Sequence, residues 1–112
     1  MIKIGITGGT GLLGLLFKEK LKKKSLRFSE FKDDILKRKK VARWISSNKN
    51  LEYIFHFAAI SSTQKAESNK KKAKNVNVLG TENLIKEINK NKKNIWFFFQ
   101  VPHMFMIFPR NQ

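Results

Sequence analysis

Apolar and polar positions along the chain follow two alternating patterns. Short runs of β-branched and aromatic residues, bounded by glycine, asparagine or charged residues, are typical of buried strands. Between them lie longer segments whose apolar residues recur every three or four positions, as in helices that cover a sheet. Strands are predicted at residues 2–7, 25–31, 51–60 and 94–99, and helices at 12–24, 33–50 and 66–91. This alternation predicts one α/β domain with a parallel sheet of about four strands.

The same pattern predicts how the elements pack. In the first helix the apolar face consists of Leu12, Leu13, Leu16, Phe17 and Leu21. In the later helices it consists of Val41, Trp44, Ile45, Val76, Leu79, Leu84 and Ile88. We expect the strands in the order 3-2-1-4, with the last one unpaired along one edge. A long aromatic edge favours aggregation, so the sheet of an intact domain is expected to continue there.

The net charge is strongly positive. With 24 Lys and Arg against 8 Asp and Glu, the 112-residue chain carries a formal charge of +16. Such a charge is typical of proteins that bind nucleic acid or an anionic surface, and a small basic protein of this kind is the alternative function. However, only four basic residues are arginine, and the lysines are spread over several helix-like runs. This pattern favours the codon usage of an A+T-rich genome, so no specific nucleic-acid partner is predicted.

Other features limit the setting of the protein and its chemistry. There are no cysteines, which excludes disulfides and thiolate metal sites. No secretory signal precedes the first strand, and the apolar run near the end is shorter than the roughly 20 residues that span a bilayer. We therefore expect a cytoplasmic protein without membrane contact. The histidines His56 and His103 lack a carboxylate spacing that indicates a metal site, so no metal is predicted.

The segment from Gly8 to Gly14 is the clearest candidate for chemistry. Gly8, Gly11 and Gly14 lie between an apolar strand and an amphipathic helix, with no charged residue among them. Glycines allow a sharp turn with positive φ and leave no side chain between a ligand and the helix amides. Those amides are unpaired and carry a partial positive charge, which suits a diphosphate. The spacing predicts a dinucleotide-binding turn; a tight turn that binds nothing is the alternative.

Two motifs resemble those of the extended short-chain dehydrogenase/reductases, the NAD-dependent epimerase/dehydratase group. The first is TGGTGLLG at residues 7–14. The second runs from HFAAI at residues 56–60 through KAES to VNVLGTENL at residues 76–84, and is similar to a segment of dTDP-4-dehydrorhamnose reductase-like proteins. The resemblance covers residues 2–99 and implies a Rossmann-type, three-layer α/β domain that binds NAD or NADP. In this interpretation residues 1–99 form an incomplete cofactor-binding domain.

The resemblance also implies roles for individual residues. Some would offer backbone groups to the cofactor diphosphate, some would flank the adenine ring, and some would line a ribose. The diphosphate group consists of Gly8, Gly11, Leu12 and Leu13, the adenine group of Asp34 and Ile35, and the ribose group of Ala58, Ala59 and Ile60. Thr10, within the same turn, is also assigned to the cofactor site. Two alternatives stay open: Asp34 as a helix cap, and the two alanines as core packing. NAD and NADP are not distinguished, because Glu30 could hold ribose hydroxyls whereas Arg27 could favour a 2′-phosphate.

The residues that catalyse hydride transfer in the family have no counterpart in this chain. The family carries a Ser or Thr after the fourth predicted strand, then a Tyr-x-x-x-Lys pair whose Tyr is the general acid and base. The only tyrosine here is Tyr53, near the start of the third predicted strand. Back-translation of residues 100–107 permits Ser-Ser-Ser-His-Val-Tyr-Asp in the preceding frame, so residues 100–112 are expected to be an out-of-frame or non-native tail. No catalytic residue is assigned, and a nucleotide-sugar substrate is expected only for a full-length parent.

Overall fold

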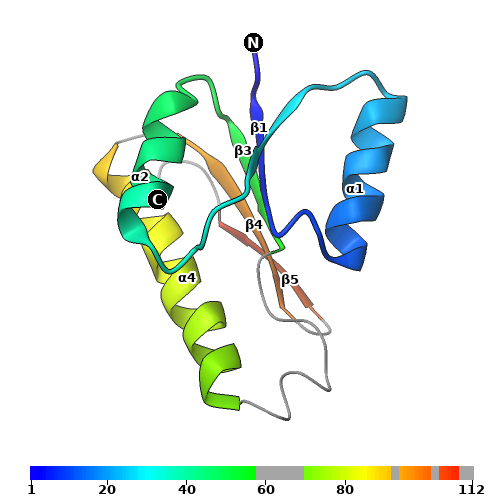
Figure 1. Cartoon of the computed structure of the whole chain (residues 1–112). Coiled ribbons are helices and arrows are strands. Elements are labelled where there is room, and N and C mark those ends of the chain that lie inside the picture. Colours follow the sequence, from blue (N-terminus) through cyan, green and yellow to red (C-terminus); the bar gives the residue numbers. More distant parts are fainter. Residues whose placement is uncertain (58–69, 92–93, 102–103, 109–112) are drawn as a thin grey trace.

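The computed structural model describes residues 1–57, 70–91, 94–101 and 104–108 (Figure 1). In chain order the elements are β1 (Ile4–Thr7), α1 (Leu12–Lys23), β2 (Phe28–Phe31), α2 (Arg38–Ser47), β3 (Tyr53–His56), α4 (Lys70–Lys90), β4 (Trp96–Val101) and β5 (Met104–Phe108). Every predicted strand and helix is present, with shifted bounds. The prediction of an α/β domain with a parallel sheet is confirmed.

The strands form one sheet in the order β2-β1-β3-β4-β5. The first four are parallel, and Thr7 of β1 pairs with Phe31 of β2 on one side and with His56 of β3 on the other. The predicted order 3-2-1-4 is wrong, because β3 lies beside β1 and not beyond β2. The burial of the strands gives the reason. Most of β2 is only half-buried, which suits an edge, whereas Ile54 and His56 of β3 are buried.

The sequence pattern does not predict β5, which changes the edge of the sheet. β4 was expected to be unpaired along one side, and this expectation is wrong, because Phe97–Val101 pairs antiparallel with the backbone of Met104–Phe108. The pairing satisfies the backbone groups that an aromatic edge would otherwise expose. The antiparallel pairing does not test the reading frame of residues 100–112, so the out-of-frame tail stays a prediction.

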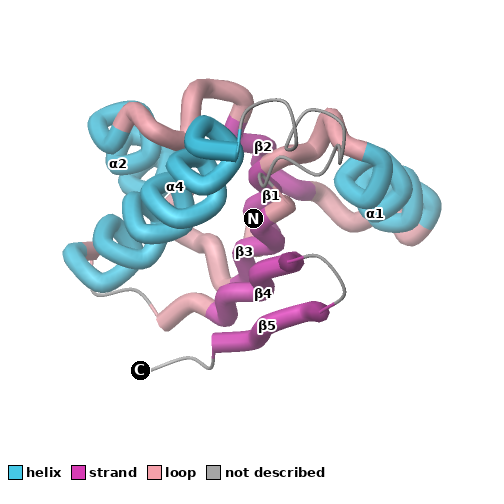
Figure 2. The backbone as a smooth tube through the Cα atoms, turned by 90° about the horizontal axis from the view of Figure 1, so that it is seen from below, coloured by secondary structure: helices cyan, strands magenta, loops and turns pink. Residues whose placement is uncertain are grey.

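Among the described elements, helices cover both faces of the sheet, with α2 and α4 together on one face and α1 on the other (Figure 2). The main core lies between the sheet and the α2–α4 pair. Its buried members are Phe31, Ile35, Val41, Ile45, Leu51, Ile54, Leu84, Ile88, Ile95 and Phe97. On the opposite face the ring of Phe17 lies 4.4 Å from that of Phe55, centroid to centroid, and fixes α1 against β3.

The apolar faces predicted for α1 and α4 are partly wrong. In α1, Phe17 is half-buried and Leu21 is buried as expected, together with Gly14. The structure instead exposes at least 45% of four side chains that were predicted to be buried, namely Leu12, Leu13 and Leu16 of α1 and Leu79 of α4. Residues 14, 17 and 21 are three and four positions apart, so they form one stripe of the helix. A glycine occupies this stripe, so the α1 backbone comes close to the turn that follows β1. The leucines beside the stripe face outward.

A short chain of hydrogen bonds crosses the core at the carboxyl ends of β1 and β3. Nδ1 of His56 lies 2.5 Å from Oγ1 of Thr7, and its Nε2 lies 3.0 Å from Oγ1 of Thr81 on α4. The imidazole stacks on the rings of Phe97 and Phe99. Burial lowers the pKa of His56 to about 4, so the ring is neutral at pH 7 and one nitrogen donates while the other accepts. β1, β3 and α4 are thereby joined through one side chain.

We expect the free energy of unfolding to fall as the pH is lowered from 6.5 toward 4. In this window the unfolded chain binds a proton at His56 and the folded chain does not, so the contribution is complete above pH 6.5 and lost below it. Between pH 7 and pH 5 the loss should be roughly 2 kcal/mol. Urea unfolding of the wild type and His56→Asn at both pH values measures it, since every other group is common to the two proteins and cancels in the difference. Equal pH dependence in the two proteins would refute the prediction.

Candidate functional site

The turn between β1 and α1 is shaped by close backbone contacts. Gly8 has a φ of 69°, a conformation that favours glycine, and its carbonyl accepts the Gly11 N–H at 3.3 Å. A Cβ at Gly14 would lie 2.5 Å from the Gly8 carbonyl oxygen and 2.7 Å from the Gly9 Cα. A Cβ at Gly11 would have no neighbour closer than 3.8 Å. Gly8 and Gly14 therefore determine the shape of the turn, whereas Gly11 leaves open space beside it.

The N-terminus of α1 presents its amides without a competing side chain. Gly11 is the N-cap residue, no side chain caps the helix there, and its first turn carries no acidic residue. Thr10 and Gly11 are exposed, and Leu12 is 73% exposed. The first N–H groups of a helix lack partners within it, and the helix dipole adds a partial positive charge at the same place. The start of α1 is therefore suited to bind a phosphate group.

A cavity of about 510 Å³ opens beside the turn, at the carboxyl ends of β1 and β2. Its lining comes from the turn, α1 and the segment after β2, namely Gly8, Gly9, Thr10, Lys18, Glu30, Phe31, Lys32, Asp33 and Ile35. Ligands of open parallel sheets bind at this edge. The cavity thus brings together three predicted site residues, Gly8, Thr10 and Ile35. Gly11, Leu12, Leu13 and Asp34 neighbour these residues in the chain without lining it.

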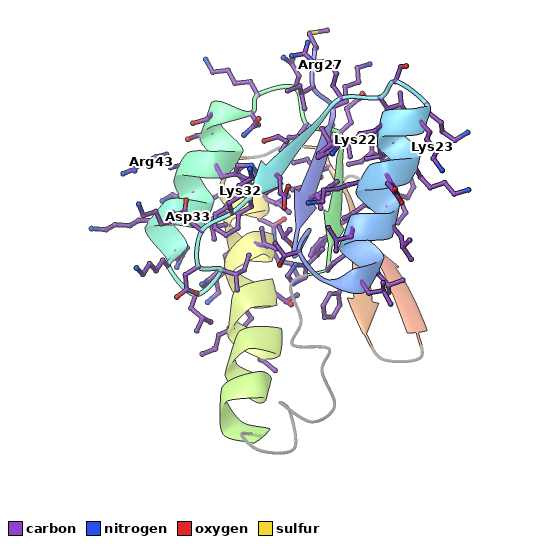
Figure 3. The ribbon with its side chains drawn as sticks, turned by 45° about the vertical axis from the view of Figure 1, so that its right-hand side comes forward. Lys22, Lys23, Arg27, Lys32, Asp33 and Arg43 are labelled. Carbon is purple, nitrogen blue, oxygen red and sulfur yellow. The ribbon has the colours of Figure 1, made fainter. Side chains whose placement is uncertain are left out.

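Glu30 and Arg27, the two candidates for distinguishing NAD from NADP, lie at opposite ends of β2. Glu30 lies under the turn, where a Cβ on Gly9 would collide with its carboxylate. Both carboxylate oxygens accept hydrogen bonds from Nζ of Lys18, at 3.1 and 3.2 Å. Arg27 precedes β2, far from Lys32 and the cavity, as Figure 3 shows. The structure therefore excludes Arg27 as the partner of a 2′-phosphate in this cavity.

Asp34 and Ile35 have different environments. Oδ1 of Asp34 accepts the Leu36 N–H at 3.0 Å, which fixes the turn before α2. The N-cap of α2 is Lys37, so the interpretation of Asp34 as the cap of that helix is wrong. Ile35 is 6% exposed and belongs to the core. It lies so close to α4 that a Cβ at Gly80 would come within 2.7 Å of its Cγ2.

Three residues of α4 that the sequence-based site omits hold these segments in place. Gly80 leaves room for the side chain of Ile35, and the hydroxyl of Thr81 forms a hydrogen bond with the buried His56. Nδ2 of Asn83 donates to the carbonyls of Ile35 and Leu36, at 3.0 and 3.2 Å. All three belong to the VNVLGTENL motif, so the signal was present in the sequence, but the pattern alone does not show which segment each residue contacts.

The remaining candidates fall outside the part of the chain that can be compared. Ala58, Ala59, Ile60 and His103 lie outside the described residues. The described part of this segment ends at Phe57, whose N–H donates to the Thr7 carbonyl at 2.8 Å. Within the described ranges, no group of three or more His, Asp or Glu residues is placed to hold a metal ion. No helix of these ranges has the length and apolar character needed to cross a membrane.

Similar proteins of known structure share this fold. A UDP-glucose 4-epimerase of Thermotoga maritima, solved with UDP-glucose, superposes with a TM-score of 0.75 at 21% identity over 88% of this chain and 37% of its own. The UDP-glucose 4-epimerase of Thermus thermophilus in complex with NAD superposes with a TM-score of 0.66 at 20% identity, over 80% of this chain and 34% of its own. A dTDP-4-dehydrorhamnose reductase of Clostridium acetobutylicum superposes with a TM-score of 0.68 at 27% identity, over 84% of this chain and 34% of its own. The chain thus spans about a third of the length of these proteins.

A family profile described as the RmlD substrate binding domain matches residues 2–98. No curated protein sequence matches the chain. The structural likeness confirms the Rossmann-type α/β fold, with the glycine turn at the carboxyl edge of a parallel sheet. The profile covers most of the 112 residues. The chain therefore belongs to the RmlD substrate binding domain family, in the epimerase and reductase group of the extended short-chain dehydrogenase/reductases that its motifs resemble.

Proposed function

We propose that the chain binds a nicotinamide dinucleotide, NAD or NADP, at the turn from Gly8 to Gly14. The observation that carries the proposal is the open space beside Gly11, where uncapped helix amides adjoin the cavity at the ends of β1 and β2. A diphosphate can approach these amides because no side chain intervenes. Epimerases of similar fold from Thermus thermophilus and Bifidobacterium longum were solved with NAD or NAD⁺, which supports the choice of ligand.

In this proposal each part of the site has a separate task. The backbone at Thr10, Gly11, Leu12 and Leu13 holds the diphosphate, and the cavity takes the adenosine half of the cofactor. Its adenine is flanked by the Asp34–Ile35 segment, which Asn83 fixes through two carbonyls. Residues 58–60 follow the end of β3 and would line a ribose. When bound, the nicotinamide ring supplies hydride transfer, which the protein side chains cannot perform.

We further propose that residues 1–99, as the cofactor-binding part of a nucleotide-sugar reductase or epimerase, bind the cofactor without turnover. Hydride transfer to or from a sugar needs a general acid or base beside the nicotinamide. The single tyrosine, Tyr53, begins β3, at the end of the sheet opposite the turn. Its hydroxyl therefore lies far from any ligand at the carboxyl edge. A nucleotide-sugar would be the substrate of a full-length parent, with residues 100–112 as a non-native tail.

The alternative function, binding of nucleic acid or an anionic surface, rests on the net charge of +16. Lys22 and Lys23, near the C-terminus of α1, and Arg27 are exposed in the same region (Figure 3). Such binding would depend on counterion release and fall steeply with salt. Binding of a dinucleotide through backbone amides would respond little to salt, so a salt titration separates the two functions.

Substitution of Gly11 should weaken dinucleotide binding without destabilising the fold. Gly11 has extended backbone geometry, and a Cβ there meets open space, so Gly11→Val should unfold near the wild-type temperature. Its side chain would occupy the approach to the amides and weaken NADH binding, measured by fluorescence titration, roughly tenfold or more. Leu15→Ala, on an exposed part of α1, is the control and should bind normally. Wild-type affinity in Gly11→Val would exclude this site.

Gly14→Ala should act in the opposite way, through the fold. Its Cβ would meet backbone atoms of Gly8 and Gly9, which cannot move aside as a flexible side chain can. We expect a loss of about 1–3 kcal/mol in the free energy of unfolding, measured in urea, since overpacking against rigid atoms costs this much. A Gly14→Ala protein as stable as the wild type would show that α1 does not approach the turn as described.

Asn83 should affect binding through the position of Ile35. Asn83→Ala removes two donors and leaves the carbonyls of Ile35 and Leu36 without them, at a cost of about 1–2 kcal/mol in stability. Amide hydrogen exchange should then accelerate at residues 34–37, and NADH affinity should fall several-fold. Glu82→Ala, exposed on the same helix, is the matched control. Unchanged exchange at residues 34–37 would argue against this positioning role.

A further inference from the structure

The two edges of the sheet differ in the charge that their strands carry. Among the described strands, β2 forms one edge and β5 the other. The strand β2 contains Glu30 and is flanked directly by Arg27 and Lys32. Charged residues on or beside an edge strand hinder the pairing of a second chain with it, because pairing would remove them from water. The edge at β2 is therefore protected against a further strand.

The edge at β5 lacks this protection. Met104–Phe108 contains neither a charged residue nor a proline, and it lies within residues 94–109, the longest run of the chain without Lys, Arg, Asp or Glu. One side of β5 pairs with β4, and no described strand pairs with its other side. In an antiparallel pair, alternate residues direct their N–H and C=O groups away from the partner strand. The outer side of β5 can therefore accept another strand.

The basic residues belong to other elements of the fold. They are frequent in α1, α2 and α4, whereas the sequences of β4 and β5 have none. Figure 2 shows β5 at the margin of the sheet beyond β4, with α1 and α2 toward the opposite end. Two copies with a formal charge of +16 each repel one another when their lysine-rich helices come together. Approach along β5 instead brings together two strands without charged residues.

We propose that β5 pairs antiparallel with β5 of a second copy of the chain, so that the two sheets become one. The same strand is the partner that fits, because it is equally uncharged and has the matching open edge. The pairing is isologous, since each strand donates to and accepts from the other about a two-fold axis. Full overlap of Met104–Phe108 places Met106 opposite itself. The dinucleotide turn at Gly8–Gly14 takes no part, so this proposal is independent of the proposed function.

Sedimentation equilibrium at several protein and salt concentrations tests the pairing. We expect a monomer–dimer equilibrium with a Kd of roughly 10–100 µM, because interfaces below about 1,200 Å² are typical of weak complexes. The dimer should become tighter as NaCl is raised from about 0.05 to about 0.5 M, since salt screens the repulsion between two positive copies. A chain that stays monomeric, a dimer that salt weakens, or association that continues beyond the dimer would each overturn the proposal.

Charges introduced at the centre of β5 identify the strand that pairs. Met106→Lys and Met106→Glu each place like charges opposite one another in a homodimer, so each variant alone should associate at least about tenfold more weakly. An equimolar mixture places opposite charges together, so it should regain the dimer, which also shows that both variants keep β5.

Leu15→Lys and Leu15→Glu are the matched controls, since they change the charge equally on an exposed part of α1. Both should dimerise like the wild type. Loss of the dimer in the Leu15 variants, or its retention in each Met106 variant alone, would assign the contact to another surface. A mixture of the Met106 variants that stays monomeric would likewise refute the pairing of β5 with itself.

Discussion

The close approach of the α1 backbone to the turn after β1 is the contact on which the site depends. It exists because Gly14 has no Cβ to meet the Gly8 carbonyl and the Gly9 Cα. The same contact determines which side of α1 faces the sheet, so Phe17 reaches Phe55 while the neighbouring leucines remain exposed. It also directs the uncapped end of the helix toward the carboxyl edge of β1. A fold requirement and a binding requirement thus coincide in one glycine.

A second set of contacts ties that edge to α4. His56 links Thr7, directly before the turn, to Thr81, while Asn83 and Gly80 fix Ile35 at the cavity. The two ends of the second motif, one at the end of β3 and one within α4, are therefore joined physically as well as in sequence order. Buried hydrogen bonds require defined partners and directions, which apolar packing does not. The polar bonds lie beside the cavity, where the position of the backbone matters most.

The sequence predicted element types better than their arrangement. Strands such as Tyr53–His56 and the glycine turn carry strong local signals, because burial selects apolar runs and positive φ selects glycine. The strand order was missed, since it depends on how polar β2 is relative to β3, a comparison between distant segments. β5 was missed because its place in the sheet is determined by pairing with β4 and not by its own residue pattern. In the site, Lys18 and Glu30 come from different elements, so no periodicity relates them.

The few acidic residues have a consistent use that connects stability to binding. Of eight Asp and Glu residues, Glu30, Glu52 and Glu87 are in ion pairs, and Glu87 is only 2% exposed against Arg38. Only the Lys18–Glu30 pair is largely buried on both sides, at 15% and 12% exposure, and it joins α1 to β2. A buried pair contributes little net stability, but removal of one partner costs about 3–5 kcal/mol, so this pair favours one arrangement of α1 on the sheet. Glu30 and Glu87 are also withdrawn from the surface, with side chains 12% and 3% exposed. The remaining field is dominated by lysines, and it favours an anionic ligand at the edge where the helix amides are open.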